Sequence, residues 1–194
     1  MRALNLSRNQ ISELPRGIED LSRLEELILS FNNFTSLPST LSQIKTLRKL
    51  ELSSNSKLDL LKFFKENPEF PRLEDLDLSG NRVDTISVNV GNMSNLRTLK
   101  LANNQLKSLP DALSKLAKLE ELDLGGNEFR NIPQCVLLMP GLEKLNLDFN
   151  KISYIPEDIG QMKDLKQISL RYNPLNEREV DKLKKLLPNT EILR

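Results

Sequence analysis

Apolar residues recur along this chain in one phrase, Leu-x-x-Leu-x-Leu-x-x-Asn, in which polar residues occupy most of the intervening positions. One copy consists of Leu24, Leu27, Leu29 and Asn32. The Leu-x-Leu centre of the phrase has a period of two, which predicts a short β-strand with one apolar and one polar face. Each copy therefore predicts one strand whose leucines point into a core.

The asparagine that closes the phrase returns at a nearly constant spacing. Every interval is 23 residues except one of 26, and the position is filled by Asn9, Asn32, Asn55, Asn81, Asn104, Asn127, Asn150 and Asn173. A period of about 20 to 50 residues is typical of a solenoid, in which each unit buries its apolar residues only against its neighbours. We therefore expect one continuous, elongated domain.

The segment after each asparagine is also repetitive. Most copies continue as x-Leu-x-x-Leu-Pro-x-x-Ile-x-x-Leu, for example over residues 11–21 and 106–116. Proline is excluded from an interior strand, so this return segment is predicted to be irregular, with at most a turn of helix. The third copy is three residues longer and lacks Leu-Pro, and residues 56–73 predict a short amphipathic helix instead.

With both segments in view, the chain resembles the leucine-rich-repeat family over nearly its whole length. The best agreement is with the 23-residue class that short bacterial repeat proteins and intracellular eukaryotic scaffolds share. The resemblance implies an α/β solenoid: a horseshoe with a concave parallel β-sheet, an irregular or 3-10 convex side and a C-terminal helical cap.

Residues 1–175 are predicted to form eight such repeats, of which the first is incomplete because Met1 takes the place of its first leucine. Terminal repeats normally carry a polar cap. We therefore expect either that upstream sequence is missing or that a partner or a second copy of the chain covers this edge.

Residues 176–194 are predicted to form a capping helix and a closing segment of the same domain. Asn176 is a candidate helix N-cap, and Glu179 stands at the spacing of a capping box. The predicted helix carries an apolar face and is stopped by Pro188, after which residues 191–193 can close the edge of the sheet.

The closing asparagines need a physical reason, because the bend out of each strand turns backbone polar groups toward the core. An asparagine side chain both donates and accepts hydrogen bonds, and buried polar groups need partners. We expect the asparagines to form a structural ladder in which each side chain bonds the backbone of the next turn.

Composition narrows the function. The chain carries 28 basic and 27 acidic residues, well mixed, with a net charge of +1, and no basic block indicates nucleic-acid binding. No apolar run approaches the ~20 residues of a membrane span. The first ten residues lack the apolar core of a signal peptide, which favours the cytoplasm, with a secreted bacterial protein as the alternative.

Histidine is absent, and Cys135 is the single cysteine. The chain alone therefore cannot form a Ser-His-Asp or Cys-His catalytic arrangement, an internal disulfide or a zinc site of cysteine and histidine. We expect no cofactor and no metal. Lysines among the acidic residues of the sheet would oppose a hard cation.

Strand alternation identifies the residues that face outward from the sheet. Exposed aromatic residues beside arginine are typical of interface anchors. On this basis the candidate partner-binding residues are Phe31, Lys100, Asp123, Asp148, Phe149, Arg171 and Tyr172. Charges alternate in sign between neighbouring copies, so this face is either a self-paired cross-strand ladder or a charged recognition surface.

The sixth copy differs on its convex side. Leu137 and Leu138 fall where other copies carry polar residues. With Cys135 they are candidates for a small apolar docking or dimerisation patch. Scattered apolar surface residues are the alternative explanation.

The predicted function is that of a non-enzymatic module that binds a protein partner on its concave face, because a rigid sheet is a preformed surface. The alternatives are the substrate-recognition part of a larger enzyme, such as a bacterial ubiquitin ligase, and a bacterial protein that binds a host surface. In the ligase alternative Cys135 is the one candidate nucleophile, with no histidine to activate it.

Overall fold

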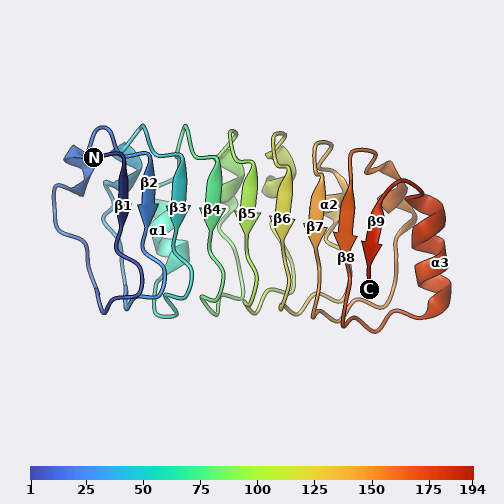
Figure 1. Cartoon of the computed structure of the whole chain (residues 1–194). Coiled ribbons are helices and arrows are strands. Elements are labelled where there is room, and N and C mark those ends of the chain that lie inside the picture. Colours follow the sequence, from blue (N-terminus) through green and yellow to red (C-terminus); the bar gives the residue numbers. More distant parts are fainter.

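A computed structural model describes all 194 residues of the chain. Nine short parallel strands form one open sheet in which spatial order follows chain order. Most of the helices lie behind the sheet, and α3 lies at its C-terminal end (Figure 1). The strands are β1 (Ala3–Asn5), β2 (Glu26–Ile28), β3 (Lys49–Glu51), β4 (Asp75–Asp77), β5 (Thr98–Lys100), β6 (Glu121–Asp123), β7 (Lys144–Asn146), β8 (Gln167–Ser169) and β9 (Glu191–Leu193).

The register of the sheet follows the repeat. Leu27 lies opposite Leu50, and Leu50 lies opposite Leu76, so the middle residues of successive strands form one buried column. Because neighbouring residues of a strand point to opposite faces, this column turns the first and third residue of every strand outward. This column is one of several rows of buried apolar residues through which each unit packs against the next.

The side opposite the sheet consists of short helices. Five are 3-10 helices: η1 (Ile18–Asp20), η2 (Leu41–Gln43), η3 (Val88–Asn92), η4 (Asp111–Lys115) and η5 (Glu157–Gln161). Three are α-helices: α1 (Leu60–Glu66), α2 (Gln134–Leu137) and α3 (Glu177–Leu186). The prolines keep the return segments irregular, and the predicted solenoid with a concave parallel sheet and a 3-10 convex side is confirmed.

The core is a single cluster of 51 buried residues that extends from Leu14 to Leu187. In the third unit the predicted helix forms as α1, with Asp59 as its N-cap, and it buries Phe63 and Phe64. Their rings meet edge to face at 4.9 Å. Because these aromatic side chains point inward, α1 covers the convex side and does not protrude.

The asparagine ladder forms as predicted over the repeats, although its bonds run to the preceding unit. Asn104 Nδ2 donates to the Leu78 carbonyl of the previous repeat (3.1 Å) and to the Leu101 carbonyl of its own (3.0 Å). Its Oδ1 accepts from the backbone N–H groups of Asn81 and Val83. Each buried amide thereby satisfies polar groups in two turns of the solenoid.

The first position of the ladder differs from the others. Asn9 is exposed, and its amide donates only to the carbonyls of Leu6 and Ser7 in its own repeat. The amide of every other ladder asparagine also donates to a carbonyl of the repeat before it, as Asn32 does to Leu6 at 2.8 Å. Asn9 is therefore the one member of the ladder without an inter-repeat bond from its amide group.

At the other end α3 lies against the last repeat (Figure 1), and β9 pairs with β8 as expected for a closing segment. Asn176 caps α3 by accepting from the N–H of Glu179 at 3.0 Å. The capping box is not completed, because Glu179 Oε2 accepts from the backbone N–H of Ile155 at 2.8 Å instead. Glu179 therefore attaches the helix to the neighbouring repeat.

The prediction of an exposed convex patch is wrong. Leu137 is only 6% exposed and Cys135 only 2%, whereas Leu138 is 60% exposed. Residues 134–137 form the helical turn α2, in which the side chains of Cys135 and Leu137 point into the core. A single exposed leucine remains, and it is not a patch.

The longest helix, α3, has ten residues and is highly charged, and no helix is long and apolar enough to cross a bilayer.

Candidate protein-binding face

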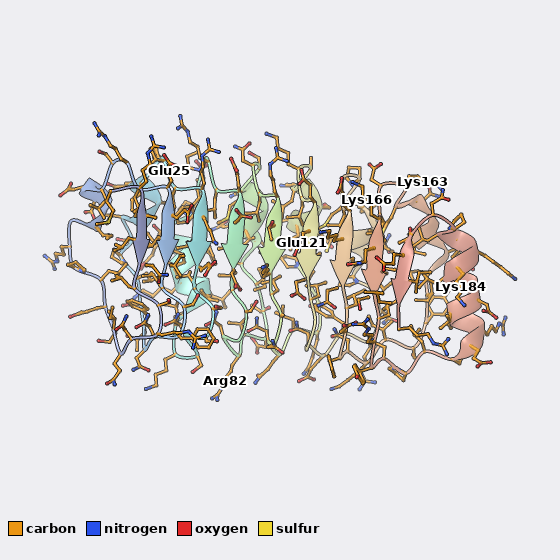
Figure 2. All side chains as sticks on the ribbon, in the orientation of Figure 1. Glu25, Arg82, Glu121, Lys163, Lys166 and Lys184 are labelled. Carbon is orange, nitrogen blue, oxygen red and sulfur yellow. The ribbon has the colours of Figure 1, made fainter.

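The outward residues of strands β2–β8 and the residues that follow them form the concave face. Figure 2 shows side chains projecting from the whole sheet, with Glu121 near its centre. The face is polar and carries no enclosed cavity comparable to a small-molecule pocket, which is usually concave and mostly apolar. It offers an extended surface to a macromolecule.

At the edge where the strands begin, charges are paired between repeats. Glu25 and Lys166 mark this edge in Figure 2. Four cross-strand ion pairs lie along it: Arg2–Glu25 (3.6 Å), Arg48–Glu74 (2.7 Å), Arg97–Glu120 and Lys166–Glu143 (2.7 Å). For this row the self-paired ladder that the alternating signs predict is confirmed.

The rows inside the sheet are different. The one ion pair among them joins Lys49 to Glu51 of the same strand, at 2.8 Å, and none crosses to a neighbouring strand. Asp77 and Asp123 turn Oδ1 back to the N–H groups of Ser79 (2.9 Å) and Gly125 (3.0 Å). These local bonds hold both carboxylates away from Lys100, which has no ion-pair partner within 4.0 Å.

Asp123 lies in the densest polar network of the face. Its Oδ1 also accepts from Asn146 Nδ2 on the next strand, at 2.8 Å. Gly125 makes this approach possible, because a Cβ there would lie 3.0 Å from Asn146 Nδ2 and 3.3 Å from Asp123 Oδ1. Burial raises the pKa of Asp123, and the two hydrogen bonds oppose that effect. Asp123 Oδ2 has no hydrogen bond.

Asp148 continues this network on the next repeat. Its Oδ1 accepts from Ser169 Oγ (2.5 Å) and from the backbone N–H of Arg171 (2.8 Å), so Oδ2 is free. The guanidinium of Arg171 is exposed and makes no ion pair. A shallow depression of about 260 Å³ lies among these residues and is bounded by Glu121, Asp123, Lys144, Asn146, Asp148, Gln167, Ser169, Arg171 and three leucines.

Beside the depression, Phe149 and Tyr172 stack with ring centroids 4.2 Å apart. They are 59% and 73% exposed. Both have positive φ values, 53° and 57°, in the left-handed region that glycine favours. Every repeat has this conformation at the equivalent position. The residue there is glycine in two other repeats, Gly80 and Gly126, and Arg8, Phe31, Ser54 or Asn103 in the remaining four.

A smaller aromatic site lies at the opposite end of the sheet. Phe31 is exposed and also has positive φ, and the Arg8 guanidinium lies 5.0 Å from its ring centre. This cation–π contact already occupies one face of the ring. Phe31 is therefore separate from the Phe149–Tyr172 pair and partly covered by its own chain.

The structure therefore brings together Asp123, Asp148, Phe149, Arg171 and Tyr172 at the β6–β8 end of the face. Lys100 lies on β5 beside a second small depression, of about 140 Å³, which it shares with Lys49 and Asp75. The remaining candidate, Phe31, belongs to the other end. The predicted set forms one cluster with two separate members.

Sequence reasoning missed the groups that hold this cluster. Asn146 and Ser169 fix the carboxylates of Asp123 and Asp148, and both lie one repeat further along the chain. The signal was present in the spacing, because an interval of 23 residues places Asn146 opposite Asp123 in the register. Equal spacing of polar residues can therefore indicate inter-repeat hydrogen bonds as well as ion pairs.

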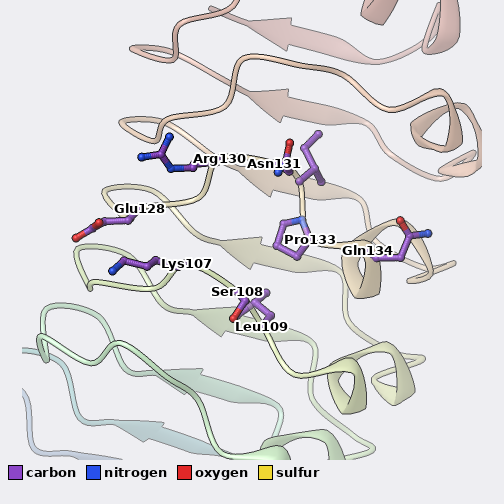
Figure 3. A pocket seen from close by; sticks show the side chains of 9 residues that line it. Lys107, Ser108, Leu109, Glu128, Arg130, Asn131, Pro133 and Gln134 are labelled. Atoms are coloured by element: carbon purple, nitrogen blue, oxygen red, sulfur yellow. The ribbon is translucent and has the colours of Figure 1, made fainter.

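A further depression, of about 600 Å³, lies on the return segments away from the sheet face (Figure 3). Lys107, Glu128 and Arg130 project at its rim. Lys151 donates to Glu128 at 3.1 Å and, with smaller contributions from Lys107 and Arg130, lowers the pKa of this carboxyl. The depression is open, and the Glu128 carboxylate at its rim is already paired with Lys151.

Cys135 has none of the surroundings that activate a thiol. It is buried, and burial raises the pKa of its thiol to about 11, with Asp111 adding to the effect. Reactive cysteines instead have lowered pKa values and are accessible. The thiol therefore gives no support to catalysis at this position.

Comparison with known proteins gives the same architecture. Family models described as leucine-rich repeat match residues 1–56, 71–129 and 141–162. No curated protein sequence matches the chain. Proteins of this repeat family are typically non-enzymatic modules for protein–protein interaction.

Several solved structures share the fold. Internalin C2 of Listeria monocytogenes superposes with a TM-score of 0.78 at 22% identity, over 100% of this chain and 79% of that one. A repeat protein of Leptospira interrogans gives 0.65 at 23% identity, over 95% and 76%.

A chain in the Toll–Spatzle complex of Drosophila gives a TM-score of 0.77 at 23% identity, and the match covers 99% of this chain and 28% of that one. These identities show likeness of fold alone. The family models, by contrast, match more than half of the sequence. This chain therefore belongs to the leucine-rich-repeat family.

Proposed function

We propose that this chain is a non-enzymatic module that binds a protein partner on its concave face, at the end formed by strands β6–β8. The stacked pair Phe149 and Tyr172 would be the anchor. Aromatic side chains next to arginine are enriched among the few residues that dominate binding energy. Asp123, Asp148 and Arg171 would surround the anchor with polar groups.

The single observation that carries this proposal is the exposure of the stacked pair. A left-handed backbone recurs at this position in every repeat, so the conformation alone does not distinguish these two residues. Neither ring fills the core, because both are mostly exposed. Burial against a partner accounts for two large, mostly exposed rings stacked side by side.

The rigidity of the support also favours this function. Asp123 and Asp148 beside the rings are fixed by hydrogen bonds from Asn146 and Ser169, and the strands are fixed by their hydrogen bonds in the sheet. A preformed surface loses little conformational entropy when a partner binds. Because little entropy is lost, an anchor of only two rings can suffice.

The test is a capture experiment with three immobilised proteins: the native chain, a Phe149→Ala/Tyr172→Ala variant and a Val88→Ala/Leu138→Ala control. Val88 and Leu138 are as exposed as Phe149 but lie away from the concave face. Each anchor residue is worth about 2 kcal/mol or more, so the first variant should bind a specific partner at least about 30-fold more weakly. The control should retain it.

Thermal unfolding must first show that both variants are folded. A partner that the native chain and the Phe149→Ala/Tyr172→Ala variant recover equally would remove these rings from the binding site. Loss of the partner from the control would show that the convex side binds instead.

A further inference from the structure

The concave face has a charge of its own that differs from that of the chain. The outward positions of β2–β8, with the position two residues after each of these strands, carry seven acidic and four basic residues. These are Glu26, Glu51, Asp75, Asp77, Glu121, Asp123 and Asp148 against Lys49, Lys100, Lys144 and Arg171. The face therefore has a net charge of −3, whereas the whole chain has +1. The surface outside the face is correspondingly basic.

The carboxylates of this face are also available. The charges at the strand-start edge are consumed in four cross-strand ion pairs, but inside the sheet only Glu51 has an ion-pair partner. Asp123 and Asp148 direct their hydrogen bonds to one oxygen each and leave the other free. Glu121 makes no side-chain bond and points out from the centre of the sheet (Figure 2).

The aromatic pair is a second feature of the face that favours a cationic partner. The stacked rings of Phe149 and Tyr172 lie beside Asp148, and the outer face of an exposed ring attracts cations. The chain already makes this contact elsewhere, because Arg8 lies over Phe31 and Lys182 Nζ lies 4.4 Å from the Tyr154 ring centre. No protein cation occupies the Phe149–Tyr172 pair.

From this charge complementarity we infer that the partner presents a basic segment to the concave face. Its lysine or arginine side chains reach the free carboxylate oxygens of Glu121, Asp123 and Asp148 and lie against the Phe149–Tyr172 rings. The inference rests on the proposed function and adds the chemistry of the partner. The same net charge disfavours an acidic protein segment and a nucleic acid, whose phosphates would be repelled.

The test uses a fluorescent peptide of alternating lysine and serine, about ten residues long. Such a peptide, when extended, is longer than the ~20 Å that separates β4 from β8. Its counterparts are the same peptide with glutamate for lysine and a single-stranded DNA oligonucleotide. Binding is measured by fluorescence anisotropy at low ionic strength, where charge attraction is least screened. The lysine peptide should bind, and the other two should not.

Two isosteric variants then locate the interaction. Glu121→Gln/Asp123→Asn removes two carboxylates of the face, and Asn at position 123 retains an oxygen for the Gly125 N–H. Glu69→Gln/Asp84→Asn removes two exposed carboxylates elsewhere that form no ion pair. The face variant should bind the lysine peptide about tenfold more weakly, and the control within about twofold of native.

Each alternative result has a defined meaning. Failure of the lysine peptide to bind, equal weakening by the two variants, or tighter binding of the glutamate peptide or DNA would overturn the basic-segment inference. The Phe149→Ala/Tyr172→Ala variant then separates the two proposals. If this variant fails to bind the glutamate peptide, the DNA or a protein partner that the native chain binds, the proposed site stands and only its charge preference is wrong. If neither Glu121→Gln/Asp123→Asn nor Phe149→Ala/Tyr172→Ala weakens binding of the peptides, the DNA or a protein partner, both proposals fail.

Discussion

The rings of Phe149 and Tyr172 stack with centroids 4.2 Å apart and planes 15° apart, although they belong to successive repeats. Both residues sit one position before a ladder asparagine, where the chain leaves the strand in a left-handed conformation. Stacking of two aromatic rings is worth about 0.5–1.5 kcal/mol beyond the area it buries. The pair is thus ordered before any partner arrives.

The left-handed conformation leads to a first prediction, on stability. Replacing Phe149 by glycine relieves the backbone but loses the stacking contact, so Phe149→Gly should stay within about 1 kcal/mol of the native free energy of unfolding. Phe149→Val loses the same contact and places a β-branched residue at positive φ, which should cost about 1–2 kcal/mol. Urea unfolding of both variants measures the difference, and equal stability would contradict it.

The asparagine ladder gives a matched pair of variants. Asn104→Ala leaves buried backbone groups of two repeats unsatisfied and should cost about 2–4 kcal/mol of unfolding free energy. Asn9→Ala removes bonds only within one exposed turn and should cost less than about 1 kcal/mol. Both are measured by urea unfolding. Similar losses at the two positions would show that the inter-repeat bonds contribute little.

Neighbouring leucines of the sixth unit test the corrected convex side. Leu137→Ala opens a cavity in the core and should destabilise the protein by about 2–5 kcal/mol. Leu138→Ala removes an exposed side chain and should change the stability by no more than about 0.5 kcal/mol. Thermal unfolding compares them. A large loss of stability in Leu138→Ala would contradict the assignment of Leu138 as an isolated exposed side chain.

Cys135 should be chemically silent in the folded protein. A pKa that rises from 9.0 to about 11 reduces the thiolate population at about pH 8 by roughly 100-fold, and burial adds steric protection. A thiol-specific chromogenic reagent should react at once in denaturant and at least about 100-fold more slowly without it. Fast labelling of the native protein would place the thiol at the surface.

The raised pKa of Cys135 also makes the free energy of unfolding depend on pH. The folded state disfavours the thiolate, so the thiol's contribution is unchanged below the unfolded pKa and is lost as pH rises from about 9 toward 11. A Cys135→Ala variant should lack this part of the alkaline decline, which thermal unfolding across that range measures. An identical decline in both proteins would contradict the assignment.

The architecture was predictable because the pattern that encodes it is local and repeated. Period-two leucines determine which side chain of each strand points inward, and the 23-residue interval determines which strand residues lie opposite each other, as Leu27 and Leu50 do. The proline found in most return segments excludes a strand there. The same pattern selected Phe149 and Tyr172 as outward-facing residues before their stacking was known.

Only the tertiary structure decided how those residues are used. The sequence alone placed Leu137 on the surface, and the one-turn helix α2 turned it inward. Alternating signs left open whether the charged rows form a self-paired ladder or a recognition surface. In the structure Asp77 and Asp123 bond the backbone two residues ahead and leave Lys100 without an ion-pair partner. Periodicity specifies the direction of a side chain, but its partner depends on rotamer, turn geometry and the neighbours that compete for each polar atom.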